Sequence, residues 1–98
     1  MPVMMRMQWA GITREQYDAM KKKVDWIHQV PEGGIFHVAS IETDGLHVTD
    51  VWRAAEDFQR FVDKRLTPAA QELKIPGQPT VAIHPAYAVW DARNRVEL

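Results

Sequence analysis

Hydrophobic residues recur along the chain with two different spacings. In residues 3–9 an apolar side chain stands at every second position, which predicts a strand with one strongly apolar face. The same period of two predicts further strands over residues 35–42, 46–52 and 80–88. Apolar positions spaced by three and four predict two helices, one from Thr13 towards Pro31 and one over residues 53–65.

The helix boundaries follow from local signals. Thr13 and Gln16 have the spacing of a capping box, in which each side chain bonds the other residue's backbone amide. One stripe of this helix is apolar and should face the core; it consists of Tyr17, Met20, Val24 and Ile27. Pro68 is disfavoured inside a helix, so residues 67–73 are expected to form a separate short helical turn.

A hairpin is predicted between the second and third strands. Asp44 and Gly45 are a strong two-residue turn signal, because a type I′ turn needs positive φ at both central positions. This turn would pair Thr43 with Leu46 and so place His37 opposite Trp52, with Asp50 one diagonal away on the same face.

The predicted order is β-α-β-β-α-β. This order indicates an α+β fold of ferredoxin-like type: a four-stranded antiparallel sheet with both helices on one face, in a single domain over residues 1–98. Residues 89–98 are expected to form a polar C-terminal tail that reaches over a surface or a partner. Because nothing remains to cover the far face of the Val/Met/Ile-rich sheet, we expect a second copy to cover it in a homodimer.

Composition narrows the classes of partner. The chain has 12 basic and 13 acidic side chains, a balance that gives no electrostatic basis for binding nucleic acid or a membrane surface. It has no cysteine, which excludes disulfides, zinc–thiolate sites and thiol catalysis. The start of the chain lacks a signal-peptide layout, so a cytoplasmic location is the default expectation.

Four stretches of the sequence resemble a known group of proteins: Gly34 to Ala39, Asp50 to Trp52, Phe58 to Val62 and Leu66 to Pro68. The chain resembles, over nearly its whole length, the dimeric α+β-barrel proteins of the antibiotic-biosynthesis-monooxygenase-like superfamily. The resemblance implies a ferredoxin-like fold and a homodimeric barrel. It leaves function open, because the superfamily includes cofactor-free oxygenases, haem-degrading enzymes and isomerases.

Two positions depart from that pattern. Such proteins often carry a serine cap after the tryptophan that precedes the second helix, whereas this chain has Ala54 there. The haem-degrading branch has an asparagine on the first strand and a histidine on the second helix. Here the first strand offers Gln8, and the second helix has no histidine. The resemblance therefore does not extend to haem degradation.

One group of side chains could form a small-molecule site. His37 and Asp50 fit a general base and the carboxylate that orients it, since such a carboxylate fixes the tautomer of the imidazole. Trp52 could stack against a flat aromatic ligand, and Tyr17 and His84 are further candidates for binding the substrate. The histidine spacings predict no metal site, and no glycine-rich phosphate loop precedes a helix, so no cofactor is expected.

Three functions stay open at this point. The chain could be a cofactor-free enzyme of monooxygenase or isomerase type, acting on an aromatic or polyketide-like compound. It could instead bind a small molecule without turning it over. It could also be a structural dimer in which His37 and Trp52 serve only in packing, because single histidines on buried strands usually do so.

Overall fold

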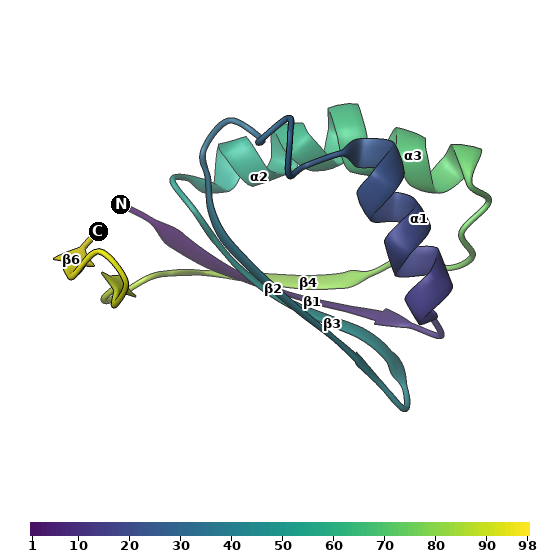
Figure 1. Ribbon diagram of the computed structural model, residues 1–98, viewed down its shortest axis with the longest axis horizontal. Coiled ribbons are helices and arrows are strands. Elements are labelled where there is room, and N and C mark those ends of the chain that lie inside the picture. The colour runs from purple at the N-terminus through teal and green to yellow at the C-terminus, as the bar shows by residue number, and fades with distance from the viewer.

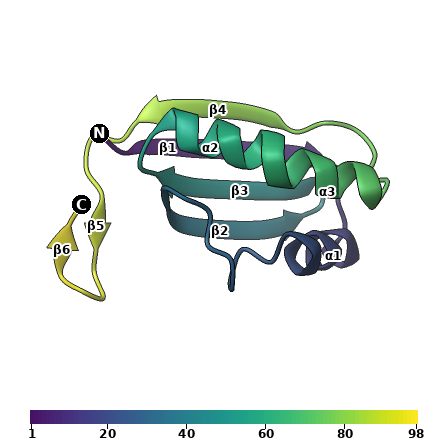
Figure 2. The same cartoon turned by 90° about the horizontal axis from the view of Figure 1, so that it is seen from above.

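The computed structural model describes residues 1–98 as one sheet covered by one layer of helices (Figure 1). The elements in chain order are β1 (Val3–Ala10), α1 (Arg14–Val24), β2 (Gly34–Glu42), β3 (Gly45–Trp52), α2 (Ala55–Phe61), η1 (Val62–Leu66), α3 (Thr67–Glu72), β4 (Thr80–Pro85), β5 (Trp90–Asp91) and β6 (Val96–Glu97). The main sheet is antiparallel with the order β2-β3-β1-β4, and all the helices lie on one of its faces (Figure 2). The predicted ferredoxin-like α+β fold is confirmed.

Helix α1 begins as the sequence predicts and ends earlier. Thr13 and Gln16 form the full capping box, with the Gln16 amide donating to the Thr13 hydroxyl and the Thr13 amide to the Gln16 side chain. Asp25 then takes a left-handed conformation, with a φ of 57°, and the helix stops at Val24. The prediction that the helix continues towards Pro31 is therefore wrong, and Ile27 lies exposed in the loop that follows.

The β2–β3 hairpin has a different register from the predicted one. Glu42 pairs with Gly45, so that Thr43 and Asp44 form the loop and Gly45 begins β3 with a φ of 129°. An irregularity between Gly34 and Phe36 shifts the pairing once more near the other end of β2. From Phe36 to Glu42 the predicted pairing was off by two residues, and a shift of two keeps each of these side chains on its predicted face.

The second helical region is one almost continuous run (Figure 2). A five-residue π turn, η1, connects α2 to α3, and Pro68 lies in the first turn of α3. Pro68 has no amide hydrogen and its ring would collide with the carbonyl four residues earlier in a regular helix. The widened turn accommodates this proline, and α3 follows it as the short helical segment predicted for residues 67–73.

The core lies between the sheet and the helices. It comprises residues from β1, the turn after it, β3, α1, α2 and α3: Met5, Met7, Trp9, Ile12, Met20, Val24, Leu46, Val48, Trp52, Phe58, Ala69 and Ala70. Met5, on the central strand β1, is the most deeply buried large side chain, at 1% exposure. Truncating such a side chain to alanine costs about 2–5 kcal/mol.

The other face of the sheet is uncovered in the single chain. Phe36 and Val38 of β2 are 62% and 51% exposed, and β4 ends at Pro85, three residues earlier than predicted. The C-terminal residues form a small separate hairpin, β5–β6, that extends away from the sheet (Figure 1). No helix has the length and hydropathy needed to cross a bilayer.

Candidate functional site

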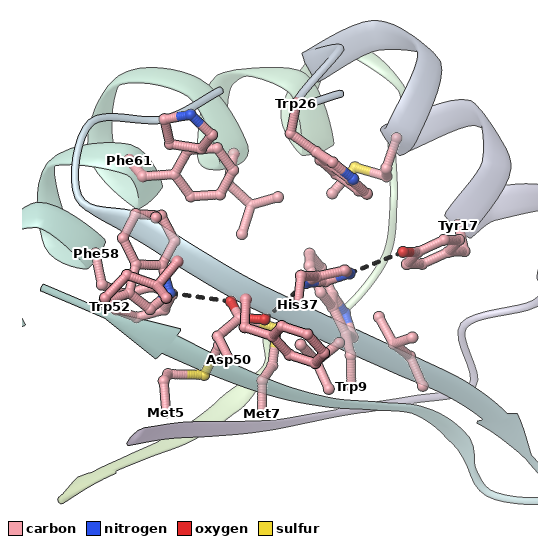
Figure 3. Close-up of a pocket in the computed structure, with 18 of the residues that line it drawn as sticks. Met5, Met7, Trp9, Tyr17, Trp26, His37, Asp50, Trp52, Phe58 and Phe61 are labelled. Carbon is pink, nitrogen blue, oxygen red and sulfur yellow. Dashed lines mark hydrogen bonds and ion pairs between the residues drawn. The ribbon is translucent and has the colours of Figure 1, made fainter. Parts of the chain in front are cut away.

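A cavity lies between the helix layer and the inner face of the sheet (Figure 3). Its volume is about 190 Å³, and most of its lining is apolar, from β1, β3, both helical regions and the loop after α1. The ionisable side chains in the lining are Tyr17, His37 and Asp50. A cavity with apolar walls and a few directed polar groups has the usual form of a small-molecule site.

His37 and Asp50 are paired directly across β2 and β3. The corrected register places them opposite each other, whereas the predicted register had put Trp52 in that position. His37 Nδ1 lies 2.6 Å from Asp50 Oδ1, a short hydrogen bond to a carboxylate. The histidine side chain keeps 35% of its surface exposed and the aspartate only 8%, so the carboxylate is the inner member of the pair.

Trp52 holds the other oxygen of the same carboxylate. Its indole Nε1 donates to Asp50 Oδ2 at 3.0 Å, so both oxygens of the buried carboxylate have a partner. The Trp52 ring packs against Phe58 and Phe61, with centroids 5.5 and 5.4 Å away. Trp52 is 4% exposed and lines the cavity, and it therefore serves as a wall of the site and as an anchor for Asp50.

Tyr17 occupies the remaining nitrogen of His37. Its Oη lies 2.8 Å from His37 Nε2, so three side chains from α1, β2 and β3 form a continuous chain of hydrogen bonds (Figure 3). Burial raises the pKa of the Tyr17 hydroxyl above its usual value, and the negative charges of Asp50 and Asp18 act in the same direction. Tyr17 is therefore an uncharged phenol near neutral pH.

The hydrogen-bond partners define the tautomer of a neutral His37. An ionised carboxylate can only accept, so Nδ1 carries the hydrogen and donates to Asp50. Nε2 then presents its lone pair to the cavity and accepts from the Tyr17 hydroxyl. A lone pair of this kind can take a proton from a bound hydroxyl compound, with Tyr17 either displaced or relaying the proton.

Trp26 is a member of the site that sequence reasoning missed. It lies two residues beyond the end of α1, and its ring centroid is 5.4 Å from that of His37 and 5.7 Å from that of Tyr17. The predicted longer helix gave this residue no place on the apolar stripe. The unusual number of tryptophans in the chain was the only sequence signal that could have pointed to it.

His84 does not join the other predicted site residues. It pairs with Met4 across β4 and β1, in the set of residues on the face opposite Met5 and the cavity. The structure brings His37, Asp50 and Trp52 together as the hairpin predicted. It also brings in Tyr17, a candidate whose position the sequence could not give, and it leaves His84 out. The periodicity of the last strand placed His84 and Ile83 on opposite faces of that strand. The sequence could not say which of the two faces the helices cover.

The remaining histidines lie outside the cavity, as predicted, and each pairs with a carboxylate. His28 Nδ1 lies 2.7 Å from Asp25 Oδ1. His47 lies near Asp44 and Glu42 at the hairpin turn, where the three potential ligand atoms are within 4.8 Å of one another. The spacing in the sequence did not indicate this proximity; in the structure His47 Nε2 is bonded to Asp44 at 2.7 Å.

The fold is similar to that of several solved structures. SnoaB, a cofactor-independent oxygenase from Streptomyces nogalater, aligns with a TM-score of 0.58 and 16% identity over 87% of this chain and 90% of SnoaB. A conserved protein from Methanosarcina mazei Go1 aligns with a TM-score of 0.61 and 12% identity, over 87% and 93% of the two chains. A monooxygenase from the gene ActVA-Orf6 of Streptomyces coelicolor, in complex with the ligand nanaomycin D, gives 0.50 and 19%, over 93% and 92%.

The chain shares its α+β fold with these solved structures. This confirms the fold that the sequence resemblance implied. No protein-family model matches the sequence, and no curated protein matches it. At these identities the likeness carries the fold, and the chemistry has to be argued from the side chains of this chain.

Proposed function

We propose that this protein is a cofactor-free oxygenase that acts on flat, weakly acidic aromatic compounds bound in the cavity beside His37. The observation that carries the proposal is the position of His37, whose Nδ1 is fixed by Asp50 while its Nε2 faces an apolar cavity. The cavity lining contains no lysine or arginine, which favours uncharged ligands over carboxylates or phosphates.

In the proposed reaction, His37 removes a proton from an enol or phenol of the substrate. The resulting anion is electron-rich and transfers an electron to dioxygen, and recombination gives a peroxide at the activated carbon. Loss of water from this peroxide leaves a carbonyl group, so a CH₂ group and O₂ become C=O and H₂O. The protein supplies the base, its orientation by Asp50 and a water-poor site that favours reaction of the anion.

Two structural neighbours support this choice of chemistry. SnoaB is described as a cofactor-independent oxygenase, and the Streptomyces coelicolor monooxygenase was solved in complex with the ligand nanaomycin D. Aromatic rings of Trp26, Phe61 and Trp52 line the cavity of this chain, and such rings stack well on planar ligands.

The proposal is tested with anthrone, a flat three-ring ketone that enolises to a hydroxyarene. Dioxygen uptake and formation of anthraquinone are followed for the wild type and for His37→Gln. A matched control is His84→Gln, which changes a histidine on the opposite face of the sheet. We expect turnover to fall about 100-fold or more in His37→Gln and to stay unchanged in His84→Gln. The proposal would be contradicted if the wild type did not raise the rate of dioxygen uptake above the protein-free rate, either for anthrone or for a panel of related flat compounds.

Binding without turnover is the second candidate, because Tyr17 already occupies the lone pair of His37. A ligand hydroxyl has to displace Tyr17 or bond to it, and a protein built only to bind could stop there. This function would be favoured over the oxygenase if nanaomycin D raised the melting temperature of the protein while no compound of the panel gave catalysed dioxygen uptake.

We also propose that two copies of the chain pair through the uncovered face of the sheet. Phe36 and Val38 expose large apolar side chains there, and Met4 and Val51 lie beside them in the register. Contiguous apolar surface of this kind usually marks an interface, and a symmetric dimer is the commonest arrangement. The other half of the same face is polar, with Gln8 beside His47 and Thr80, so we expect the contact to centre on the apolar half.

A further inference from the structure

Arg65 connects the second helical region to the loop that follows α1. Its Nη2 donates to two backbone carbonyls, that of Val24 at 2.9 Å and that of Gln29 at 2.7 Å. The Val24 carbonyl belongs to the last turn of α1, where carbonyls lack intrahelical partners and a cation is favourable. Arg65 therefore holds the end of α1 and the middle of the 25–33 loop with one group.

The π turn gives Arg65 this position. In η1 the amide of Thr67 bonds to the carbonyl of Val62, five residues earlier, which adds one residue to the turn. The residues beyond the turn, Ala69 and Ala70, are buried on the sheet side along with Phe58. Arg65 is left half-buried beside α1 and its loop.

The loop that Arg65 holds carries part of the cavity wall. Trp26, Val30 and Pro31 of this loop line the cavity, and Trp26 packs against both His37 and Tyr17. The loop is tied to the sheet at its far end, where the Arg53 amide donates to the Gly33 carbonyl at 2.7 Å. Two groups bind the loop to the helices: Arg65 bonds to the Gln29 carbonyl in its middle, and Arg60 of α2 lies 3.6 Å from Glu32 near its end.

The Arg65 guanidinium also contacts the opposite wall. It lies over the Phe61 ring, 5.4 Å from the centroid, and Phe61 in turn packs against Trp52. One planar group thus spans from Phe61 on the helix to the loop that carries Trp26. A lysine ammonium could bond one of the two carbonyls but lacks the planar fork that stacks on a ring while donating in its plane.

We propose that Arg65 is a positioning residue for the His37 site. By holding the 25–33 loop it keeps Trp26 against His37 and Tyr17, and it fixes the distance between Trp26 and Phe61 at the mouth of the cavity. The expected effect of Arg65 on turnover rests on the proposed function, whereas its effect on the position of Trp26 beside His37 does not. A flat ring between two fixed aromatic walls is retained better than one in a mouth that opens freely.

The test uses three variants of the full chain: Arg65→Ala, Arg65→Lys and Trp26→Ala. Lys64→Ala is the matched control, because Lys64 is an exposed cation on the same turn. The first readout is the chemical shift of the His37 ring protons by NMR in the ligand-free protein. This shift senses the Trp26 ring 5.4 Å away and does not depend on any activity. Circular dichroism checks that each variant is folded.

We expect the chemical shift of the His37 ring protons in Arg65→Ala to move towards the value in Trp26→Ala. The value in Arg65→Lys should lie between those of the wild type and Arg65→Ala, and Lys64→Ala should keep the wild-type value. With anthrone, KM should rise about five- to tenfold in Arg65→Ala, because a ring between loosely held walls is bound less tightly, while kcat changes less than twofold. A folded Arg65→Ala with the wild-type His37 shift would overturn the proposal. If the shift moves but no variant or wild type turns anthrone over, the positioning role stands and the oxygenase function fails.

Discussion

His37 and Asp50 face each other directly across β2 and β3, with 2.6 Å between Nδ1 and Oδ1. The pair joins an edge strand to an inner strand, so the imidazole lies at the rim of the cavity and the carboxylate lies deeper. The inner position of Asp50 is stabilised by Trp52, which donates to its second oxygen. Nε2 of His37 bonds to Tyr17, so in the proposed function a ligand reaches this nitrogen by displacing Tyr17 or by bonding to it.

Replacing Asp50 with asparagine should disable the base while the core stays intact. The asparagine side chain can still accept from Trp52 Nε1 and can donate its amide to His37 Nδ1, which moves the imidazole hydrogen to Nε2. We expect anthrone turnover to fall about 100-fold or more in Asp50→Asn, measured as dioxygen uptake. Asp63→Asn removes a charge from an exposed position outside the site and serves as the control. Equal rates in the two variants would exclude the role given to Asp50.

Tyr17 should make the protein less stable in alkali. Its pKa is raised in the folded state, so the unfolded chain loses this proton first as pH rises. The contribution of the neutral phenol is complete below the unfolded value of about 10 and is lost as pH rises towards the higher folded value. Urea unfolding between pH 8 and 11 should therefore show a steeper loss of stability in the wild type than in Tyr17→Phe.

The control for this experiment is Tyr87→Phe, since Tyr87 is fully exposed at 101%. It should leave the alkaline slope of the wild type unchanged. The same slope in the wild type and in Tyr17→Phe would show that burial of Tyr17 does not raise its pKa.

The sequence predicted the faces of the strands better than their partners. Alternation with a period of two placed His37, Asp50 and Trp52 on one face, and a register error of two residues could not change that. The exact pairing depended on whether Asp44 or Gly45 takes the last loop position. That choice is made by the close approach of the Trp9 and Gly11 backbones, which lie 2.4 and 2.6 Å from where a Gly45 side chain would begin.

Elements whose positions depend on contacts distant in sequence could not be predicted. Trp26 reaches the site because α1 stops at Asp25, and Arg65 reaches the loop because Pro68 widens the preceding turn. The second of these depends on packing between segments far apart in the sequence, because the bond from Arg65 to Val24 joins residues 41 positions apart. Local propensity carries no record of such contacts.

Asp57 should contribute to stability at neutral pH and lose that contribution in acid. Its buried carboxylate accepts from Arg53 at 2.8 and 2.9 Å and from Arg60 at 2.9 Å, and the Arg53 bonds lower its pKa most. A lowered folded pKa means that the stabilisation is present above the unfolded value and is lost as pH falls through the folded value. The stability gap between the wild type and Asp57→Asn should be constant from pH 5 to 7 and shrink below about pH 4.

The gap is measured by urea unfolding at each pH, with Asp18→Asn as the exposed control. A gap that widens on acidification, or one equally small at every pH, would rule out this role for the Arg53–Asp57–Arg60 cluster.

The proposed dimer should depend on the apolar half of the uncovered sheet face. Val38→Glu puts a charge where two copies would meet, and unpaired charges at the centre of an interface are costly. Sedimentation at micromolar concentration should show twice the 11.3 kDa chain mass for the wild type and the single mass for Val38→Glu. Lys64→Glu on the outer helix surface should remain dimeric. A wild type that sediments at 11.3 kDa would contradict the dimer.

Determining the tautomer of His37 tests the account most directly, because the proposed proton removal needs a lone pair on Nε2. Long-range ¹H–¹⁵N NMR on the ligand-free protein, at a pH where the ring is neutral, reports which nitrogen carries the hydrogen. The account predicts a protonated Nδ1 and an unprotonated Nε2 in the wild type, with the reverse in Asp50→Asn. A wild-type His37 that carries its hydrogen on Nε2 would contradict it.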